Sequence, residues 1–137
     1  MDAVHTPAAG QPTRRSDAEL RLPADGAYVS VIRTAASGLA ARLDFTIDDI
    51  EDLRMAVSEA CALVLPEADE GSDLVTSFYL AHGELTVAVS VKATDAATVD
   101  TDGWGWQVLS ALTTKAGTST DGGTFTVVMT LHSAADL

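Results

Sequence analysis

The chain is 137 residues long, which suffices for one compact domain with a single hydrophobic core. Twenty acidic and eight basic residues give a formal net charge of −12, so the chain repels nucleic-acid backbones and anionic membranes and is better suited to a basic protein partner. The sequence has no run of about 20 apolar residues for a membrane span, one cysteine and therefore no internal disulfide, and no metal-ligand spacing among its three histidines. We therefore expect a cytoplasmic protein that binds neither nucleic acid, membrane nor metal.

The first third of the chain predicts a tail, a strand and a helix. Residues 1–16 are rich in proline and small polar side chains without periodicity, which is typical of a flexible tail. Residues 17–22 alternate in polarity, which predicts a short strand at a sheet edge or paired with a second subunit; the second arrangement would make the protein a homodimer. Apolar residues at steps of three and four predict a helix over residues 27–43. Within it, Gly38 predicts a close crossing of another helix, while Arg33 lies off the apolar stripe and is expected to be exposed.

Residues 46–65 carry the strongest helix signal. Thr46 and Asp49 predict a capping box, and apolar residues then recur on one face, with Cys61 among them as a small core residue. Glu59 does not share the acidic face of this helix but has apolar neighbours, where a carboxylate needs a partner, a pocket or water. It is therefore either a boundary residue that reaches solvent or a catalytic or nucleotide-site base.

The second half of the chain predicts most of a sheet. Strands are expected over residues 74–81 and 84–92, joined by a two-residue turn, then a helix over 104–114, strands over 116–120 and 124–132, and a tail at 133–137. With the first half, this order predicts an α+β fold: a two-layer sandwich of three helices on a mixed, mostly antiparallel sheet. Residues 17–132 would form it as a single domain.

Three stretches of the sequence resemble one protein family. They are LPADGAYVSVIRTAASGLAARLDFTIDDIEDLRMAVSEAC at residues 22–61, GWGWQVLSAL at 103–112 and GGTFTVVMTL at 122–131. The first resembles the front half of the RsbW-type anti-sigma factors, the second their second glycine box and the third their closing strand. Those proteins belong to the GHKL superfamily of ATP-binding domains and double as serine kinases. The resemblance implies a Bergerat-like fold, a homodimer, and a partner-binding surface near the first helix and the turn before it, here with Tyr28 and Arg33.

The residues that hold Mg·ATP in the resembled family are only partly kept. On the central helix the family has a glutamate and, four residues later, a metal-binding asparagine; this chain keeps Glu59 but has Leu63, which cannot ligate Mg²⁺. Where the family has an adenine-binding aspartate and a following glycine, this chain has Val91 and Ala93. Asp95 could replace the aspartate only if the strand slipped, and a slip would turn every side chain over.

The glycine-rich part of the family's site is also reduced. The segment between the second hairpin strand and Gly103 is shorter than the family's lid. Gly103 and Gly105 persist at the start of a helix, where backbone amides could bind an anion. The alternative is that these glycines let Trp104 and Trp106 pack closely against the sheet.

These patterns predict a degenerate GHKL domain that sequesters an alternative sigma factor and is released by a STAS-domain anti-anti-sigma antagonist, without kinase activity or tight ATP binding. Partner switching would then operate by competition between the two partners. The alternative is an active serine/threonine kinase that binds ATP and Mg²⁺, uses Glu59 as its catalytic base and phosphorylates its STAS antagonist. A third reading, a structural or dimerisation module without a transcription partner, would not need the family's specific helix sequence.

Overall fold

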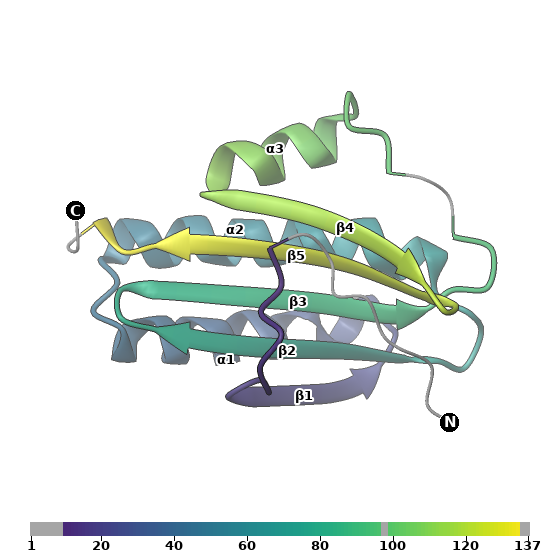
Figure 1. The fold of residues 1–137 in the computed structure, drawn as a ribbon, viewed down its shortest axis with the longest axis horizontal. Coiled ribbons are helices and arrows are strands. Elements are labelled where there is room, and N and C mark those ends of the chain that lie inside the picture. The colour runs from purple at the N-terminus through teal and green to yellow at the C-terminus, as the bar shows by residue number, and fades with distance from the viewer. Residues whose placement is uncertain (1–9, 97–98, 135–137) are drawn as a thin grey trace.

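Five strands form one sheet, and the helices lie on one of its two faces (Figure 1). The computed structural model describes residues 10–96 and 99–134. The strands are β1 (Ala18–Pro23), β2 (Asp73–Ala81), β3 (Glu84–Lys92), β4 (Lys115–Asp121) and β5 (Thr124–His132); the helices are α1 (Val29–Arg42), α2 (Ile47–Val64) and α3 (Trp104–Leu112), with short 3-10 turns η1 (Gly26–Tyr28) and η2 (Leu65–Glu67). The predicted two-layer α+β sandwich is confirmed. Among the described helices, none combines the length and apolarity that crossing a bilayer requires.

The sheet is antiparallel throughout rather than mixed. Its strand order is β1-β2-β3-β5-β4, and each neighbouring pair is antiparallel. β3 and β4 run in the same direction, because both are antiparallel to β5, but β5 lies between them and prevents a parallel pair. β1 lies at one edge, as predicted, and pairs with β2. The N-terminal tail was predicted over residues 1–16; residues 1–9 and 135–137 lie outside the described residues.

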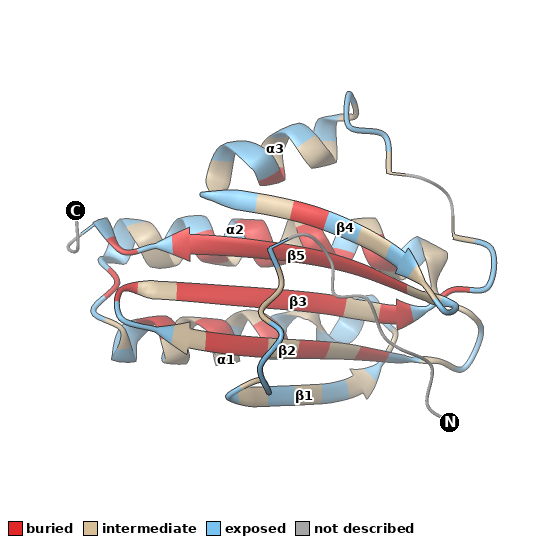
Figure 2. Ribbon diagram, in the orientation of Figure 1, coloured by how far each residue is buried: buried red, intermediate tan, exposed pale blue. Residues whose placement is uncertain are grey.

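Alternation along the strands and helical periodicity build one core between the layers (Figure 2). The sheet contributes one face of β2, β3 and β5, with Phe78, Val87 and Phe125 among its fully buried side chains. α2 lies over the middle of the sheet and contacts both α1 and α3. Its buried face consists of Leu53, Ala56, Val57, Ala60, Cys61 and Val64.

The prediction that Gly38 marks a helix crossing is wrong. Gly38 is exposed, and a Cβ atom built on it would meet nothing within 4 Å. The residues of α1 that face the core are instead Ile32, Ala36 and Ala40, which lie on the opposite side of the helix. A glycine in a helix indicates close packing only where it faces a neighbouring element. Gly38 faces solvent, and the spacing of the apolar residues did not reveal this.

The turn between α1 and α2 is held by two capping motifs. The amides of Asp44 and Phe45 donate to the carbonyls of Ala41 and Ala40, at 3.3 and 3.1 Å, which is the double hydrogen bond of a Schellman motif. Thr46 and Asp49 then form the predicted capping box, in which each side chain accepts a hydrogen bond from the other residue's backbone amide. α1 therefore ends and α2 begins within a few residues.

Asp44 adopts φ = 60°, a left-handed conformation that favours glycine. We expect Asp44→Gly to raise the free energy of unfolding by about 0.5–1 kcal/mol, because it removes the Cβ clash and keeps the backbone hydrogen bonds. Asp44→Ala keeps the Cβ and should not stabilise the protein. Urea unfolding of the two variants beside the wild type tests the order, and equal midpoints for both variants would contradict it.

Candidate functional site

The two helices that carry the predicted nucleotide residues pack side by side. A Cβ atom on Gly105 of α3 would lie 3.5 Å from Glu59 Oε2 and 3.7 Å from Leu63 Cδ2 of α2. The opposite end of α3, at Leu112, lines a cleft with Asp49 at the start of α2, so the two helices are antiparallel. The fold therefore brings together Glu59, Leu63 and Gly105, and we call this group the α2–α3 contact.

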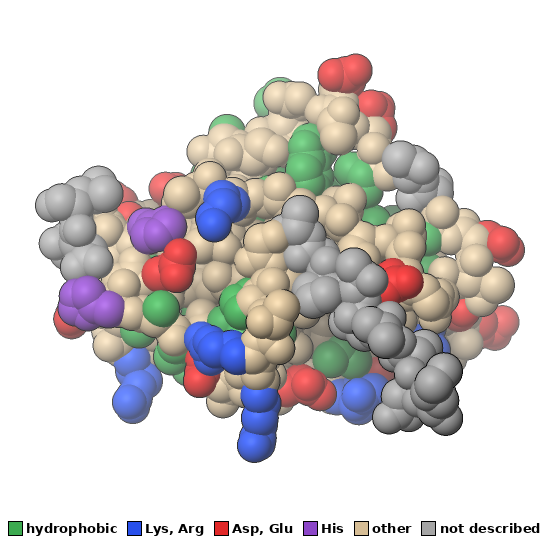
Figure 3. All heavy atoms as spheres, viewed as in Figure 1, with side chains coloured by type: hydrophobic (Ala, Val, Ile, Leu, Met, Phe, Trp, Pro, Cys, Tyr) green, Lys and Arg blue, Asp and Glu red, His purple; other side chains and the backbone are tan. Residues whose placement is uncertain are grey.

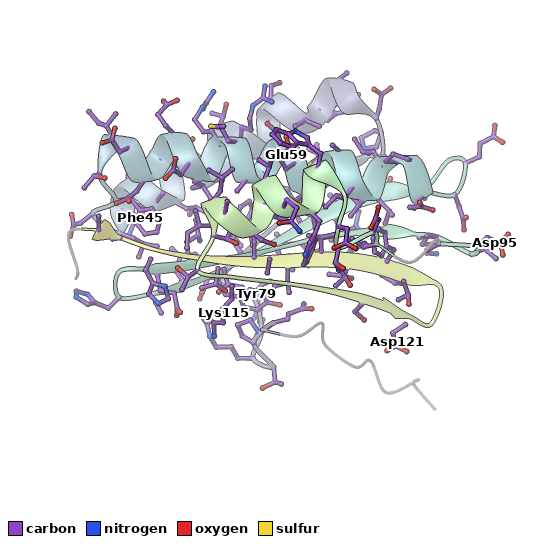
Figure 4. All side chains as sticks on the ribbon, turned by 90° about the horizontal axis from the view of Figure 1, so that it is seen from above. Phe45, Glu59, Tyr79, Asp95, Lys115 and Asp121 are labelled. Atoms are coloured by element: carbon purple, nitrogen blue, oxygen red, sulfur yellow. The ribbon has the colours of Figure 1, made fainter. Side chains whose placement is uncertain are left out.

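Glu59 lies at the boundary of the protein rather than in its core. Its side chain is half-buried, and Figure 4 shows it on the helix side of the sheet, beside α3. Within the described part of the chain, no hydrogen bond or ion pair restrains its carboxylate. This environment agrees with a glutamate that reaches solvent, and it leaves the carboxylate able to accept a proton from a group that approaches from outside.

Leu63 stands at the position where the resemblance implied a metal-binding asparagine. Its half-buried side chain has no oxygen, and it packs toward Gly105. Residues 10–96 and 99–134 contain no group of three or more His, Cys, Asp or Glu side chains that could hold a metal ion. Position 63 therefore supplies no oxygen ligand for Mg²⁺.

Gly103 is explained by a tight backbone turn. A Cβ atom there would lie 3.0 Å from the carbonyl oxygen of Asp100 and 3.4 Å from Asp100 Oδ2. The Gly103 amide donates to that carbonyl, and the Asp102 amide donates to the Asp100 carboxylate. A carboxylate thus already lies at the start of α3, where a phosphate would need to bind, and its charge opposes an incoming anion.

The two tryptophans behave differently from each other. Trp106 packs against the main core, as the packing explanation of the glycines required. Trp104 is 82% exposed, so the expectation that it packs against the sheet is wrong. Trp104 is the first residue of α3, and its side chain points into solvent.

The end of β3 keeps the register that the sequence predicted. Val91 is 2% exposed, faces the core and pairs with Phe125, and the Ala93 amide donates to the Gly123 carbonyl. The strand has not slipped, so Asp95 does not take the place of Val91. Asp95 is exposed and lies at one end of the molecule, away from Glu59 near its middle (Figure 4).

A hydrogen-bonded carboxylate fixes the segment that follows β3. Asp69 accepts hydrogen bonds from the Thr94 amide at 3.0 Å and the Thr94 hydroxyl at 2.7 Å, and its own amide donates to the Lys92 carbonyl. The backbone and side-chain bonds from Thr94 hold the pKa of Asp69 below its usual range. An adjacent cleft of about 260 Å³ is lined by Ala93, Thr94, Ala96, Thr120, Gly123 and Thr124, none of which is a carboxylate.

On the side of α2 that faces α1, two arginines join these two helices, one from each helix. Arg33 of α1 donates to the Ser58 hydroxyl at 3.0 Å, and Arg54 of α2 donates to the Ser37 hydroxyl at 3.2 Å. Each serine hydroxyl donates in turn to a backbone carbonyl of its own helix. Arg33 is thus half-buried, which corrects the expectation that it is fully exposed. Arg54 was missed by the sequence reasoning, although its four-residue spacing from Ser58 places both on the same side of α2.

Cys61 lies in the core, as the sequence predicted, and Tyr28 lies at the surface. Tyr28, at the turn before α1, is 37% exposed. Cys61 is buried, and desolvation raises the pKa of its thiol to about 12, so it is an unreactive core residue.

Comparisons with known proteins give matches in sequence and in fold. The chain is 42% identical over 73 residues to serine-protein kinase RsbW of Halalkalibacterium halodurans, and 39% identical over 75 residues to serine-protein kinase RsbW of Bacillus subtilis. Each match covers 53% of this chain and, respectively, 45% and 47% of the relative, so the match extends over about half of those proteins. No family model matches the chain.

A solved structure supports the fold. The crystal structure of the RsbU and RsbW domains of a Mycobacterium tuberculosis protein matches with a TM-score of 0.67 over 85% of this chain and 32% of that chain. The sequence identity is 20%, so this likeness concerns the fold alone.

The two glycines at α3 should respond oppositely to alanine. We expect Gly105→Ala to raise the free energy of unfolding by about 0.5 kcal/mol, because the new methyl group would make ordinary contacts with α2 and alanine favours helix. Gly103→Ala should lower it, because its methyl group would clash with a backbone carbonyl. Urea unfolding measures both, and destabilisation by Gly105→Ala would mean that the α2–α3 contact is tighter than described.

Proposed function

We propose that this chain is an RsbW-type protein of the GHKL superfamily that sequesters an alternative sigma factor without acting as a kinase. A STAS-domain anti-anti-sigma protein would release the sigma factor by competing for this chain. We infer the loss of kinase activity from the α2–α3 contact. There Leu63 stands at the position of the family's metal-binding asparagine and packs toward Gly105. Val91 is buried in the core at the position of the family's adenine-binding aspartate, so the hydrogen-bond acceptor for adenine is also missing.

The partner surface that we propose is the outer side of α1 and α2. Tyr28 supplies an exposed aromatic ring there, and Val31 and Met55 are 44% and 53% exposed. Arg33 and Arg54 lie between the two helices, and neither forms an ion pair with a carboxylate within the described residues. Aromatic and arginine side chains are the commonest hot spots of protein interfaces, and an unpaired guanidinium can still bind an acidic side chain of a partner.

The overall acidity fits a partner that carries basic surfaces. A net charge of −12 on a chain of this size creates a field that speeds association with basic proteins. A sigma factor must approach DNA and therefore carries such surfaces. We further propose that the protein acts in the cytoplasm and forms a homodimer.

The second candidate is an active serine/threonine kinase that binds Mg·ATP and phosphorylates its STAS antagonist. Two observations favour it: the matched relatives are named serine-protein kinases, and Glu59 is retained with a carboxylate that is unrestrained within the described residues. Such an enzyme would have to hold the metal through oxygen atoms other than that of an asparagine at position 63.

Nucleotide titration separates the two candidates. We expect isothermal titration with Mg·ATP to show no binding tighter than about millimolar, because a metal ligand and an adenine acceptor are both missing. RsbW of Bacillus subtilis is the positive control under the same conditions. Micromolar binding, or transfer of labelled phosphate to a STAS-domain protein that is lost in Glu59→Gln, would establish the kinase.

Partner binding is tested with two arginines of α1. We expect Arg33→Ala to weaken binding of the sigma factor captured from the native lysate by about tenfold, because a charged interface hydrogen bond is lost. Arg42→Ala makes the same charge change at an exposed position of α1 and should bind normally. Ser58→Ala removes the Arg33 hydrogen bond without removing the charge, so a defect equal to that of Arg33→Ala would indicate a purely structural role.

A further inference from the structure

The outer side of α3 is apolar, although it faces solvent. Trp104, Val108 and Ala111 follow one another at steps of four and three residues and therefore share one side of the helix. Trp104 is 82% exposed, Ala111 is exposed and Val108 is half-buried, whereas Leu109 on the inner side is fully buried. A surface helix usually turns polar residues outward, so this side of α3 is an exception.

α2 contributes a second row of side chains beside the first. Asp52, Met55 and Glu59 follow one another at steps of three and four residues and share one side of α2. Glu59 lies next to Gly105 at one end of α3, and Asp52 lines a cleft with Ala111 at the other end. Met55, which is 53% exposed, lies between these two ends. We call the two rows together the α2–α3 seam, which consists of Asp52, Met55, Glu59, Trp104, Val108 and Ala111.

The cleft at one end of the seam is acidic and has a volume of about 230 Å³. Asp49 and Asp52 line it, and Leu112 and Leu131 add apolar surface. Burial opposes ionisation of Asp49, but hydrogen bonds from backbone amides, chiefly that of Ala134, hold the pKa of its carboxyl below the usual range. The described last turn of α3 carries no basic residue, so its free carbonyl groups add to the negative potential.

The other end of the seam is acidic as well. Asp100 and Asp102 are exposed on the loop before α3, and Figure 3 shows acidic side chains gathered there. Glu59 adds a half-buried carboxylate. Most of the basic side chains visible in Figure 3 lie instead toward the margin where β1 lies. The seam thus has an apolar middle between two acidic ends.

We propose that the α2–α3 seam binds an amphipathic helix of a protein partner, with an arginine at each acidic end and apolar residues between them. The rise of an α-helix places Trp104 and Leu112 ~12 Å apart along α3, so arginines two turns apart on the partner helix reach both ends. One guanidinium enters the cleft, where its planar fork binds the carboxylates of Asp49 and Asp52. The other stacks on the ring of Trp104, beside Glu59.

Charge argues against a second copy of this chain as the occupant. Each molecule carries a net charge of −12, so a second copy would bring further acidic residues to the acidic ends of the seam. The inference goes beyond the proposed function, because the seam lies on the flank of α2 that faces away from α1. It meets the partner surface of α1 and α2 at Met55, and for this reason Met55 is not varied in the test.

Synthetic peptides test the chemistry of the occupant. The probe is a labelled helical peptide with two arginines two turns apart and leucines between them on the same face, and fluorescence anisotropy measures its binding to the full chain. A peptide with citrulline in place of arginine keeps the shape but loses the charge, and we expect it to bind about tenfold more weakly. A scrambled peptide of the same composition should also bind more weakly, because its arginines and leucines no longer share a face. Absence of binding by the arginine peptide, or equal binding of all three peptides, overturns the inference.

Variants of the chain test the location. We expect Trp104→Ala to weaken binding of the arginine peptide about tenfold and Asp52→Asn about fivefold, because a cation–π contact and a charged hydrogen bond are lost. Tyr28→Ala removes an exposed aromatic ring on the α1 side, and Asp95→Asn removes an exposed carboxylate beyond the end of β3; both controls should bind like the wild type. Thermal melting confirms that each variant is folded. Equal weakening by seam variants and controls would mean that the peptide senses only the overall acidity, and it would overturn the location.

Sedimentation equilibrium tests the second copy. Trp104→Ala should leave self-association of the chain unchanged, and a weaker self-association in this variant would assign the seam to a second copy and overturn the inference. Peptide binding is measured without a sigma factor, so its failure rejects the helix-binding seam and leaves the proposed function to the Arg33 test.

Discussion

Burial of the apolar face of α2 is the interaction on which the rest of the structure depends. Six of its residues are buried, and the helix contacts α1, α3, β3 and β5. Each large apolar side chain buried in this way contributes on the order of 1.5–3 kcal/mol, whereas the capping box at Thr46 contributes about 1 kcal/mol. The cap decides where α2 starts, and the burial decides where it lies. The positions of Glu59, Leu63, Arg54 and Ser58 follow from that placement.

The two flanks of α2 have different chemistry. Toward α1, Arg54 and Ser58 exchange hydrogen bonds with Ser37 and Arg33, so this boundary is polar and keeps two cations near the surface. Toward α3, the boundary joins Leu63 to a glycine with no side chain between them. A leucine stabilises such packing, whereas an asparagine would bring an amide that needs hydrogen-bond partners. The same helix thus has a polar, hydrogen-bonded boundary toward α1 and a closely packed boundary toward α3.

The sheet also has two unlike faces. Its inner face is apolar and closed by the helices, while its outer face joins small apolar residues with threonine pairs that bond to each other. This uncharged outer face contrasts with the net charge of −12 that the chain carries as a whole. Arg14 and Asp17 hold residues 10–17 against the outer face of the sheet. They bond to each other and to the backbone of Leu80 at the end of β2.

Local patterns in the sequence were sufficient to predict the helices and strands and their order. Thr46 with Asp49 marked the start of α2, and alternation marked β3 and β5. The residue types at Leu63 and Val91, compared with the resembled family, led to the prediction that metal and adenine ligation are lost. Only the tertiary structure decided that Gly105 meets Glu59, that Gly38 faces solvent, that Trp104 projects from the end of α3, and that Arg33 bonds to Ser58. It also decided that β5 lies between β3 and β4 and makes the sheet antiparallel. The reason is that periodicity and caps act over a few neighbouring residues, whereas these features depend on which distant segments bury surface against each other.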